Sequence, residues 1–92
     1  MMKSAQATID KQRAQYSSLI EGIGILARFA AEDDFEGIPE ETHLEQNREL
    51  YQEVEGLERL VADWFRGSLD DRITEVTQTA YSERLEELRS NS

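Results

Sequence analysis

The sequence has no cysteine, one proline and one histidine. Without cysteine, neither a disulfide nor a thiolate metal site can stabilise the fold. A chain of 92 residues is one domain by length, and it buries only somewhat more than about 60% of its unfolded surface. We therefore expect a single domain over residues 1–92 that is either well packed or completed by a second copy.

Basic residues are half as numerous as acidic ones. The chain has 10 Lys and Arg against 20 Asp and Glu, a net charge of −10. Phosphate groups would repel such a chain, which disfavours direct binding to nucleic acid or to an anionic membrane. The same charge favours the basic surface of another protein as the partner.

The sequence also lacks a long hydrophobic run. Its most apolar segment, LIEGIGILARFAA, contains Glu21 and Arg28, whereas a membrane span needs about 20 apolar residues. The N-terminal segment has no apolar core of the signal-peptide type. Intrinsic disorder, the other interpretation of a high net charge, is disfavoured because the apolar residues are regularly patterned. We expect a cytoplasmic protein.

Two segments rich in turn residues divide the chain. DDFEGIPEE contains Gly37 and Pro39, and FRGSLDD contains Gly67 followed by Ser68 and Asp71. Glycine after a periodic segment ends a helix, and Ser-x-x-Asp is a variant of the capping box that begins one. The pattern predicts three helices, roughly residues 5–33, 39–66 and 69–90.

Three helices and no strand define an all-α fold. A helix of 25 to 29 residues is about 38 to 43 Å long, so we predict an elongated three-helix bundle, a long helical hairpin plus a third helix, with completion by dimerisation left open. Gly22 and Gly24 lie inside the first helix and cost about 1 kcal/mol each relative to alanine. They either permit close approach of another helix or mark a bend.

The second predicted helix carries two apolar series with a seven-residue period. This pattern indicates either the face of an ordinary bundle helix or a self-association seam, with asparagine fixing the register of a two-stranded coiled coil. It covers fewer than three heptads, which favours the bundle helix. The seam residues are Asn47, Leu50, Val54, Leu57, Val61 and Trp64.

Charge is distributed unevenly along the chain. Residues 1–31 carry four basic and two acidic side chains, net +2; residues 32–66 carry three arginines and twelve acids, net −9; residues 67–92 carry three arginines and six acids, net −3. The acids of the first loop, which are Glu32, Asp33, Asp34 and Glu36, lie just before a regular series in the second helix. Nearly all of the net charge thus belongs to one region.

That series is an acidic ladder of Glu41, Glu45, Glu49 and Glu53. Four-residue spacing places like charges on one helix edge, where each pair costs a few tenths of a kcal/mol. Ion pairs are expected only from Glu45 to Arg48 and, beside the ladder, from Glu55 to Arg59. The ladder is either a solvated face or a surface that imitates a nucleic-acid backbone.

The mimic hypothesis has a geometric requirement. Four-residue steps place carboxylates about 6 Å apart along a helix, whereas one strand of duplex DNA carries a phosphate every 3.4 Å or so. Imitation of a duplex therefore needs a second acidic row, either Glu55, Glu58 and Asp63 or the acids of the first loop.

Residues suited to catalysis are scarce. Glu40-x-x-His43 is similar to an element of ferritin-like carboxylate metal proteins, but it lies in a first helical turn and has no second copy. Glu32 to Asp34 could approach it across the hairpin turn. The sequence has no nucleophile elbow and no phosphate-binding loop. We predict no enzyme activity, no metal and no cofactor.

Phe65, beside Trp64, either covers the base of the third helix or stands exposed as a contact anchor. With it, the predicted partner-binding residues are Glu32, Asp33, Asp34, Glu36, Glu41, Glu45, Glu49, Glu53 and Phe65. They suggest an inhibitor or regulator that occupies a basic surface of a nucleic-acid-handling target. Phage anti-restriction and anti-CRISPR proteins are similar in size and charge alone. The alternative is a homo-oligomeric structural or chaperone-like module with a merely solvated acidic face.

Overall fold

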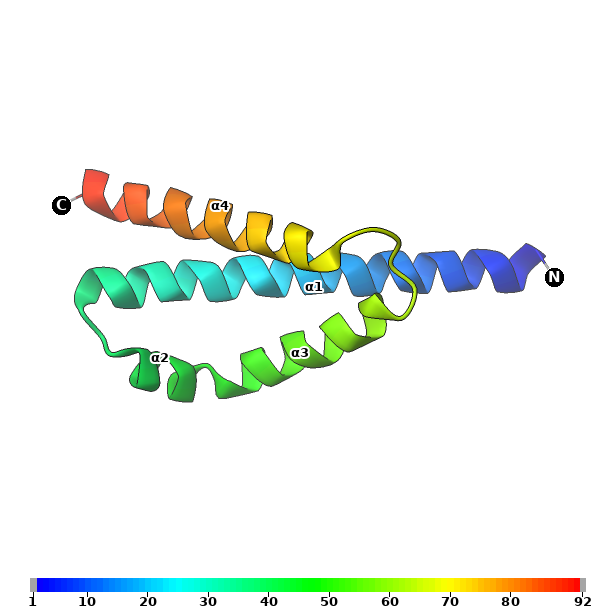
Figure 1. The fold of residues 1–92 in the computed structure, drawn as a ribbon, viewed down its shortest axis with the longest axis horizontal. Coiled ribbons are helices and arrows are strands. Elements are labelled where there is room, and N and C mark those ends of the chain that lie inside the picture. The colour runs from blue at the N-terminus through cyan, green and yellow to red at the C-terminus, as the bar shows by residue number, and fades with distance from the viewer. Residues whose placement is uncertain (1, 92) are drawn as a thin grey trace.

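The computed structural model describes the backbone of residues 2–91 and the side chains of residues 5–91. This part of the chain forms four helices and no strand: α1 (Met2–Glu36), α2 (Glu40–Gln46), α3 (Arg48–Ala62) and α4 (Leu69–Ser90). The predicted all-α class is confirmed. The molecule is elongated, with extents of 56 × 26 × 20 Å, and the N-terminal part of α1 projects beyond the other helices (Figure 1).

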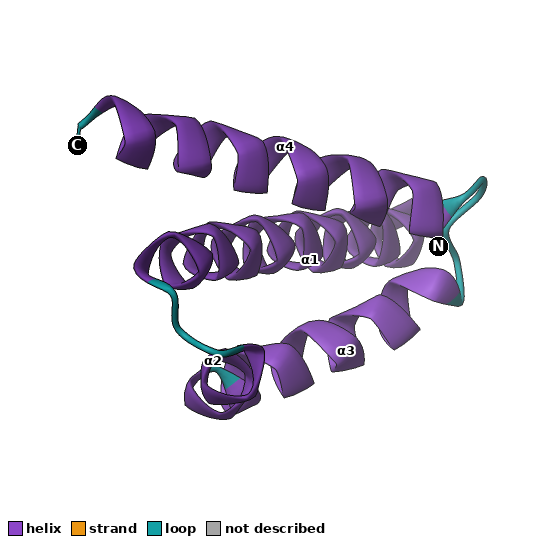
Figure 2. Cartoon of the chain, turned by 60° about the vertical axis from the view of Figure 1, so that its left-hand side comes forward, coloured by secondary structure: helices purple, strands orange, loops and turns teal. Residues whose placement is uncertain are grey.

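The three long helices form an open layer with α1 in the middle. α3 runs antiparallel to α1 on one side, and α4 runs parallel to α1 on the other (Figures 1 and 2). The extensive contacts are those of α1 with α3 and of α1 with α4. The buried core lies along α1 and consists of Leu19, Ile23, Leu26, Val54 and Val61. α1 is therefore the support on which both other long helices pack.

The first helix, predicted over roughly residues 5–33, extends to Glu36, so the acids expected in the first loop lie at the end of α1; the helix stops at the predicted glycine. Gly37 has φ of 78°, a backbone conformation that glycine adopts without a steric penalty. The amide of Gly37 donates to the Asp34 carbonyl and that of Ile38 to the Asp33 carbonyl, the paired hydrogen bonds of a Schellman motif. Pro39 is the N-cap of α2, one residue before the predicted first-turn position.

The predicted second helix, residues 39–66, is two helices. α2 ends at Gln46 and α3 begins at Arg48. Between them, Asn47 donates from its side-chain Nδ2 to the His43 carbonyl at 2.8 Å, and it has φ of −111° and ψ of 17°. The Asn47 backbone N–H donates to the same carbonyl at 3.1 Å, so the His43 carbonyl accepts two hydrogen bonds at the junction. The apolar periodicity continues across the break, which is why the pattern alone predicts one helix.

The second turn also follows its predicted signals. α3 ends at Ala62, four residues before the predicted end, and Gly67 has φ of 108°. The Ser68 hydroxyl then accepts a hydrogen bond from the Asp71 amide at 3.3 Å, which caps α4. The bounds of α4 are those predicted for the third helix.

The seam of the predicted second helix faces α1 of the same chain. Val54 and Val61 are buried, and Leu50, Leu57 and Trp64 pack against the same core. The Trp64 indole N–H also donates to Gln15 of α1 at 3.1 Å. Asn47 does not fit a coiled-coil core position, because its side chain bonds the helix junction. The apolar series thus forms an intramolecular core, the bundle-helix interpretation of the pattern.

Gly22 lies where a side chain of α3 packs directly against the backbone of α1. A Cβ atom at Gly22 would lie 2.8 Å from Val54 Cγ2, whereas a Cβ at Gly24 would meet nothing within 4 Å. Valine has a stiff side chain in a helix and Val54 is buried, so it cannot move aside cheaply. The two glycines, two residues apart, therefore differ in their function: Gly22 permits close approach and Gly24 does not.

We predict opposite effects of alanine at these two positions. Gly24→Ala should raise the free energy of unfolding by about 1 kcal/mol through helix propensity. Gly22→Ala gains the same propensity but overpacks the helix contact, which costs about 1 to 3 kcal/mol, so it should not stabilise. Urea unfolding of both variants measures the difference. Equal stabilisation by both substitutions would contradict the close approach, and Val54→Ala should partly rescue Gly22→Ala.

Candidate functional site

All four ladder carboxylates are exposed. Within the described residues, Glu41, Glu45, Glu49 and Glu53 make no side-chain hydrogen bond or ion pair. The break at Asn47 places the first two on α2 and the last two on α3, so the ladder is bent at that residue. The bent ladder borders two shallow hollows.

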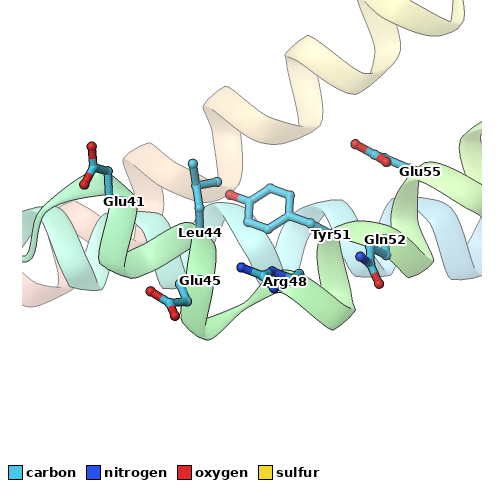
Figure 3. A pocket seen from close by; sticks show the side chains of 7 residues that line it. All are labelled: Glu41, Leu44, Glu45, Arg48, Tyr51, Gln52 and Glu55. Carbon is cyan, nitrogen blue, oxygen red and sulfur yellow. The ribbon is translucent and has the colours of Figure 1, made fainter.

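The first hollow lies over the junction of α2 and α3. Leu44 and Tyr51 lie side by side in its floor, with Glu41 and Glu55 at its two ends (Figure 3). Glu45 also lines it. Leu44 is 43% exposed, which is a large apolar contact area among carboxylates. The sequence analysis missed Leu44; an apolar residue outside the seam series in an acidic segment was the available signal.

The second hollow lies on the other side of the ladder, where α1 meets α3. It is lined by Glu45, Glu49 and Glu53 together with Phe29 of α1. Phe29 is 38% exposed. Glu45 lines both hollows, so the ladder separates two concave surfaces, each of which has an exposed apolar side chain beside acids.

The two ion pairs expected near the ladder are not formed in the described chain. Arg48 makes no ion pair with Glu45, and Arg59 makes none with Glu55. Arg48 instead lines the first hollow beside Gln52 (Figure 3). The negative charge of the ladder is consequently not neutralised by hydrogen-bonded cations of the chain itself.

Two acids of the first loop region fasten α4 to α1. Glu32 accepts from Nε of Arg84 at 2.9 Å and lies 2.8 Å from its Nη2. Asp34 accepts from the Tyr81 hydroxyl at 2.7 Å. These contacts hold the C-terminal half of α4 against the end of α1. Both residues were predicted to bind a partner; their carboxylates are used inside the fold.

A third acid of that region belongs to a network around the single histidine. His43 is 5% exposed. Its Nδ1 lies 2.5 Å from Asp33 Oδ2, and its Nε2 lies 2.9 Å from the Tyr51 hydroxyl. The network connects α1, α2 and α3, so Asp33 too serves the fold. Of the predicted acids of the first loop, Glu36 alone is exposed without a partner in the described residues.

A row of hydroxyl, imidazole and carboxylate is the arrangement that activates nucleophiles in hydrolases. Here the pKa of Tyr51 is raised, first by burial and then by the negative charges of Glu40 and Asp33. A raised pKa disfavours the phenolate, so Tyr51 is a poor nucleophile, and its hydroxyl shares a hydrogen bond with Nε2 of His43. The geometry therefore suits a structural latch, which we call the His43 latch.

Metal ligands do not converge in the described part of the chain, where no group of three His, Asp or Glu side chains is placed to hold an ion. Asp33 does approach His43 across the hairpin turn, as the sequence suggested, but as a hydrogen-bond partner. Among the same residues, no helix is long and apolar enough to cross a bilayer.

Phe65 packs within the chain. Its ring stacks on Tyr16 of α1 with centroids 5.5 Å apart and an interplanar angle of 7°, and it is half-buried. Phe65 lies in the turn between α3 and α4, and its ring packs on α1. The exposed apolar side chains beside the ladder are instead Leu44 and Phe29.

Comparisons with known proteins give no relative for this chain: no family model matches it, and neither the curated proteins nor the solved structures include a match. Inference about function therefore depends on the side chains described above. The most distinctive surface they form is the bent acidic ladder with its two hollows.

We predict that the His43 latch contributes measurably to stability. Tyr51→Phe removes the hydroxyl that is hydrogen-bonded to buried His43 Nε2, and an unsatisfied buried polar atom costs about 1 to 3 kcal/mol. Tyr81→Phe is the control, because it removes an exposed hydrogen bond to Asp34 and should cost about 1 kcal/mol at most. Thermal unfolding compares the two. A larger loss for Tyr81→Phe would contradict the latch.

Alkaline pH should weaken the fold through tyrosine ionisation. The pKa of Tyr81 is raised, chiefly by its hydrogen bond to Asp34, and that of Tyr51 by burial. Protonated hydroxyls are thus favoured in the folded state, so their stabilisation is present below the unfolded pKa of about 10 and is lost as pH rises through the higher folded values. Ultraviolet titration should show less ionisation of these tyrosines near pH 10 in the folded protein than in urea.

Proposed function

We propose that this protein is a cytoplasmic, non-enzymatic binding protein whose acidic ladder occupies a basic surface of a larger protein. One observation carries the proposal: the ladder carboxylates are exposed and unpaired, whereas three acids of the first loop region are bonded inside the fold. Unpaired like charges at four-residue spacing destabilise a helix slightly. A basic partner would relieve that repulsion.

The two hollows supply apolar contact area, which the acidic ladder alone does not. Complementary charge mainly raises the association rate and selects the partner, while buried apolar side chains provide much of the energy that holds a complex together. Leu44 and Phe29 are exposed beside the ladder and suit this role. The proposed contact surface is therefore Glu41, Glu45, Glu49 and Glu53 with these two apolar residues and Glu36.

A nucleic-acid-handling protein is the target class we favour. Such proteins present basic surfaces shaped to rows of phosphates, and the ladder is a row of carboxylates. A second row is available on α3 and its C-cap residue, Asp63, because Glu55 and Asp63 are exposed and Glu58 is half-buried. On this proposal the protein inhibits its target by occupying the nucleic-acid site, as phage inhibitors of similar size and charge do.

The homo-oligomer hypothesis has weaker support. Its seam residues Val54 and Val61 are buried against α1, and Leu50, Leu57 and Trp64 pack on the same core. A coiled-coil partner would have to replace these contacts. The remaining alternative is an acidic face that is only solvated. It predicts no charge-dependent partner, and the capture experiment below distinguishes it from the proposed function.

We predict that ladder charge controls capture of a target. Tagged protein should retain a DNA- or RNA-handling protein from bacterial lysate at about 0.1 M salt and lose it at about 0.5 M, because salt screens exposed charges. Glu45→Gln with Glu49→Gln should reduce capture at least tenfold, and added duplex DNA should displace the target.

The matched control is Glu83→Gln with Glu86→Gln on α4. These acids are exposed and make no ion pair in the described structure. The control pair therefore changes the net charge by the same amount as the ladder pair, but at a different place on the surface. Capture that survives the ladder substitutions, or that falls equally with the control pair, would overturn the proposal.

A further inference from the structure

An apolar groove runs along α1 between α3 and α4. Its floor is Ile23, Leu26, Ala27 and Ala30 of α1, with Val54 on the α3 side and Ile73 on the α4 side. The groove has a volume of about 310 Å³, enough for several side chains but not for a helix backbone. The small side chains of Ala27 and Ala30 help to keep it open.

Polar contacts fix α4, one wall of the groove, on α1 at both ends of the groove. Near one end, Arg72 of α4 donates to the Tyr16 hydroxyl of α1 at 3.1 Å. Near the other end, Arg84 and Tyr81 of α4 bond to α1. Because these bonds attach α4 to α1 and not to α3, the groove is preformed in the isolated chain.

The α3 rim of the groove is acidic. Glu55 and Glu58 line it, and within the described chain no basic side chain does. Neither glutamate makes a hydrogen bond or an ion pair in the described residues. An occupant with an apolar row and flanking Lys or Arg would match both the floor and the rim. An acidic occupant would be repelled by these carboxylates, and a purely apolar occupant would leave them without an ion-pair partner.

The groove is continuous with the ladder. Tyr51 and Glu55 line both the groove and the first hollow, whose other residues include Glu41 and Glu45 (Figure 3). A partner that crosses from one to the other would meet carboxylates first and the apolar floor next. The ladder and the groove thus form one contact surface with a charged part and an apolar part.

We propose that the groove binds a basic amphipathic helix of the partner protein. This inference rests on the proposed function and names the element of the target that is recognised. The floor extends from Ile23 to Ala30, about 10 Å or two helical turns. A partner helix would insert apolar side chains at positions i, i+3 or i+4, and i+7, with its basic flank against Glu55 and Glu58.

The test uses a fluorescent 18-residue synthetic peptide with one leucine face flanked by lysines, and anisotropy as the readout. Thr77 is exposed and lines the groove, so Thr77→Trp should block it without touching the core and weaken binding at least tenfold. Glu55→Lys with Glu58→Lys should do the same. A peptide with glutamate in place of lysine should bind at least tenfold more weakly.

Two controls locate the binding. Thr79→Trp, an exposed position on α4 outside the groove, and Glu83→Lys with Glu86→Lys should change affinity less than twofold. Circular dichroism confirms that each variant is folded. If peptide binding is absent, or is unchanged by Thr77→Trp, the groove inference is overturned.

Loss of binding only in the ladder variant Glu45→Gln with Glu49→Gln would overturn the groove inference and leave the proposed function standing. The proposed function fails on a different result: the ladder substitutions leave the amount of protein captured from lysate unchanged. Sedimentation of the protein alone tests a second copy as the occupant. Self-association that Thr77→Trp abolishes would overturn the proposal in favour of a homodimer.

Discussion

The position of the acidic ladder depends on the contact of buried His43 with Asp33. Asp33 is in the last turn of α1 and His43 is in α2, so their contact fixes where the chain returns after the first turn. The imidazole also reaches the Tyr51 hydroxyl on α3. A residue that could pass for a lone metal ligand in the sequence thus connects α1, α2 and α3 on both sides of the break that bends the ladder.

The same region shows two uses of acidic residues that composition does not distinguish. Asp33 and Asp34 are adjacent in the chain, yet one bonds a buried imidazole and the other an exposed tyrosine hydroxyl on α4. Both contacts are with residues distant in sequence or across a turn. Asp33 is partly buried and has the buried imidazole as its hydrogen-bond partner, as buried polar groups require, whereas Asp34 remains exposed to water.

Local signals made most of the fold predictable from the sequence. Gly37 ends α1 and Ser68 begins α4, each through interactions within a few residues. The first turn and the start of α4 were therefore predicted. The break at Asn47 was not, because the apolar period continues across it and the pattern carries no sign of the side-chain hydrogen bond from Asn47 to the His43 carbonyl. The site was predicted in part: the ladder is exposed, but the tertiary partners Arg84, Tyr81 and His43 of the first-loop acids have no signature in local spacing.

The open layer has a consequence for how cooperatively the molecule unfolds. α4 has no fully buried residue, and its extensive contacts are with α1. Helices that bury little apolar surface open at lower free energy than the core, as separate units of hydrogen exchange. Because the buried core is formed by α1 and α3, we expect the amides of α4 to exchange as a unit separate from that core. An occupant that touches both α3 and α4 would join the two units into one. Its binding would then slow hydrogen exchange at amides far from the contact.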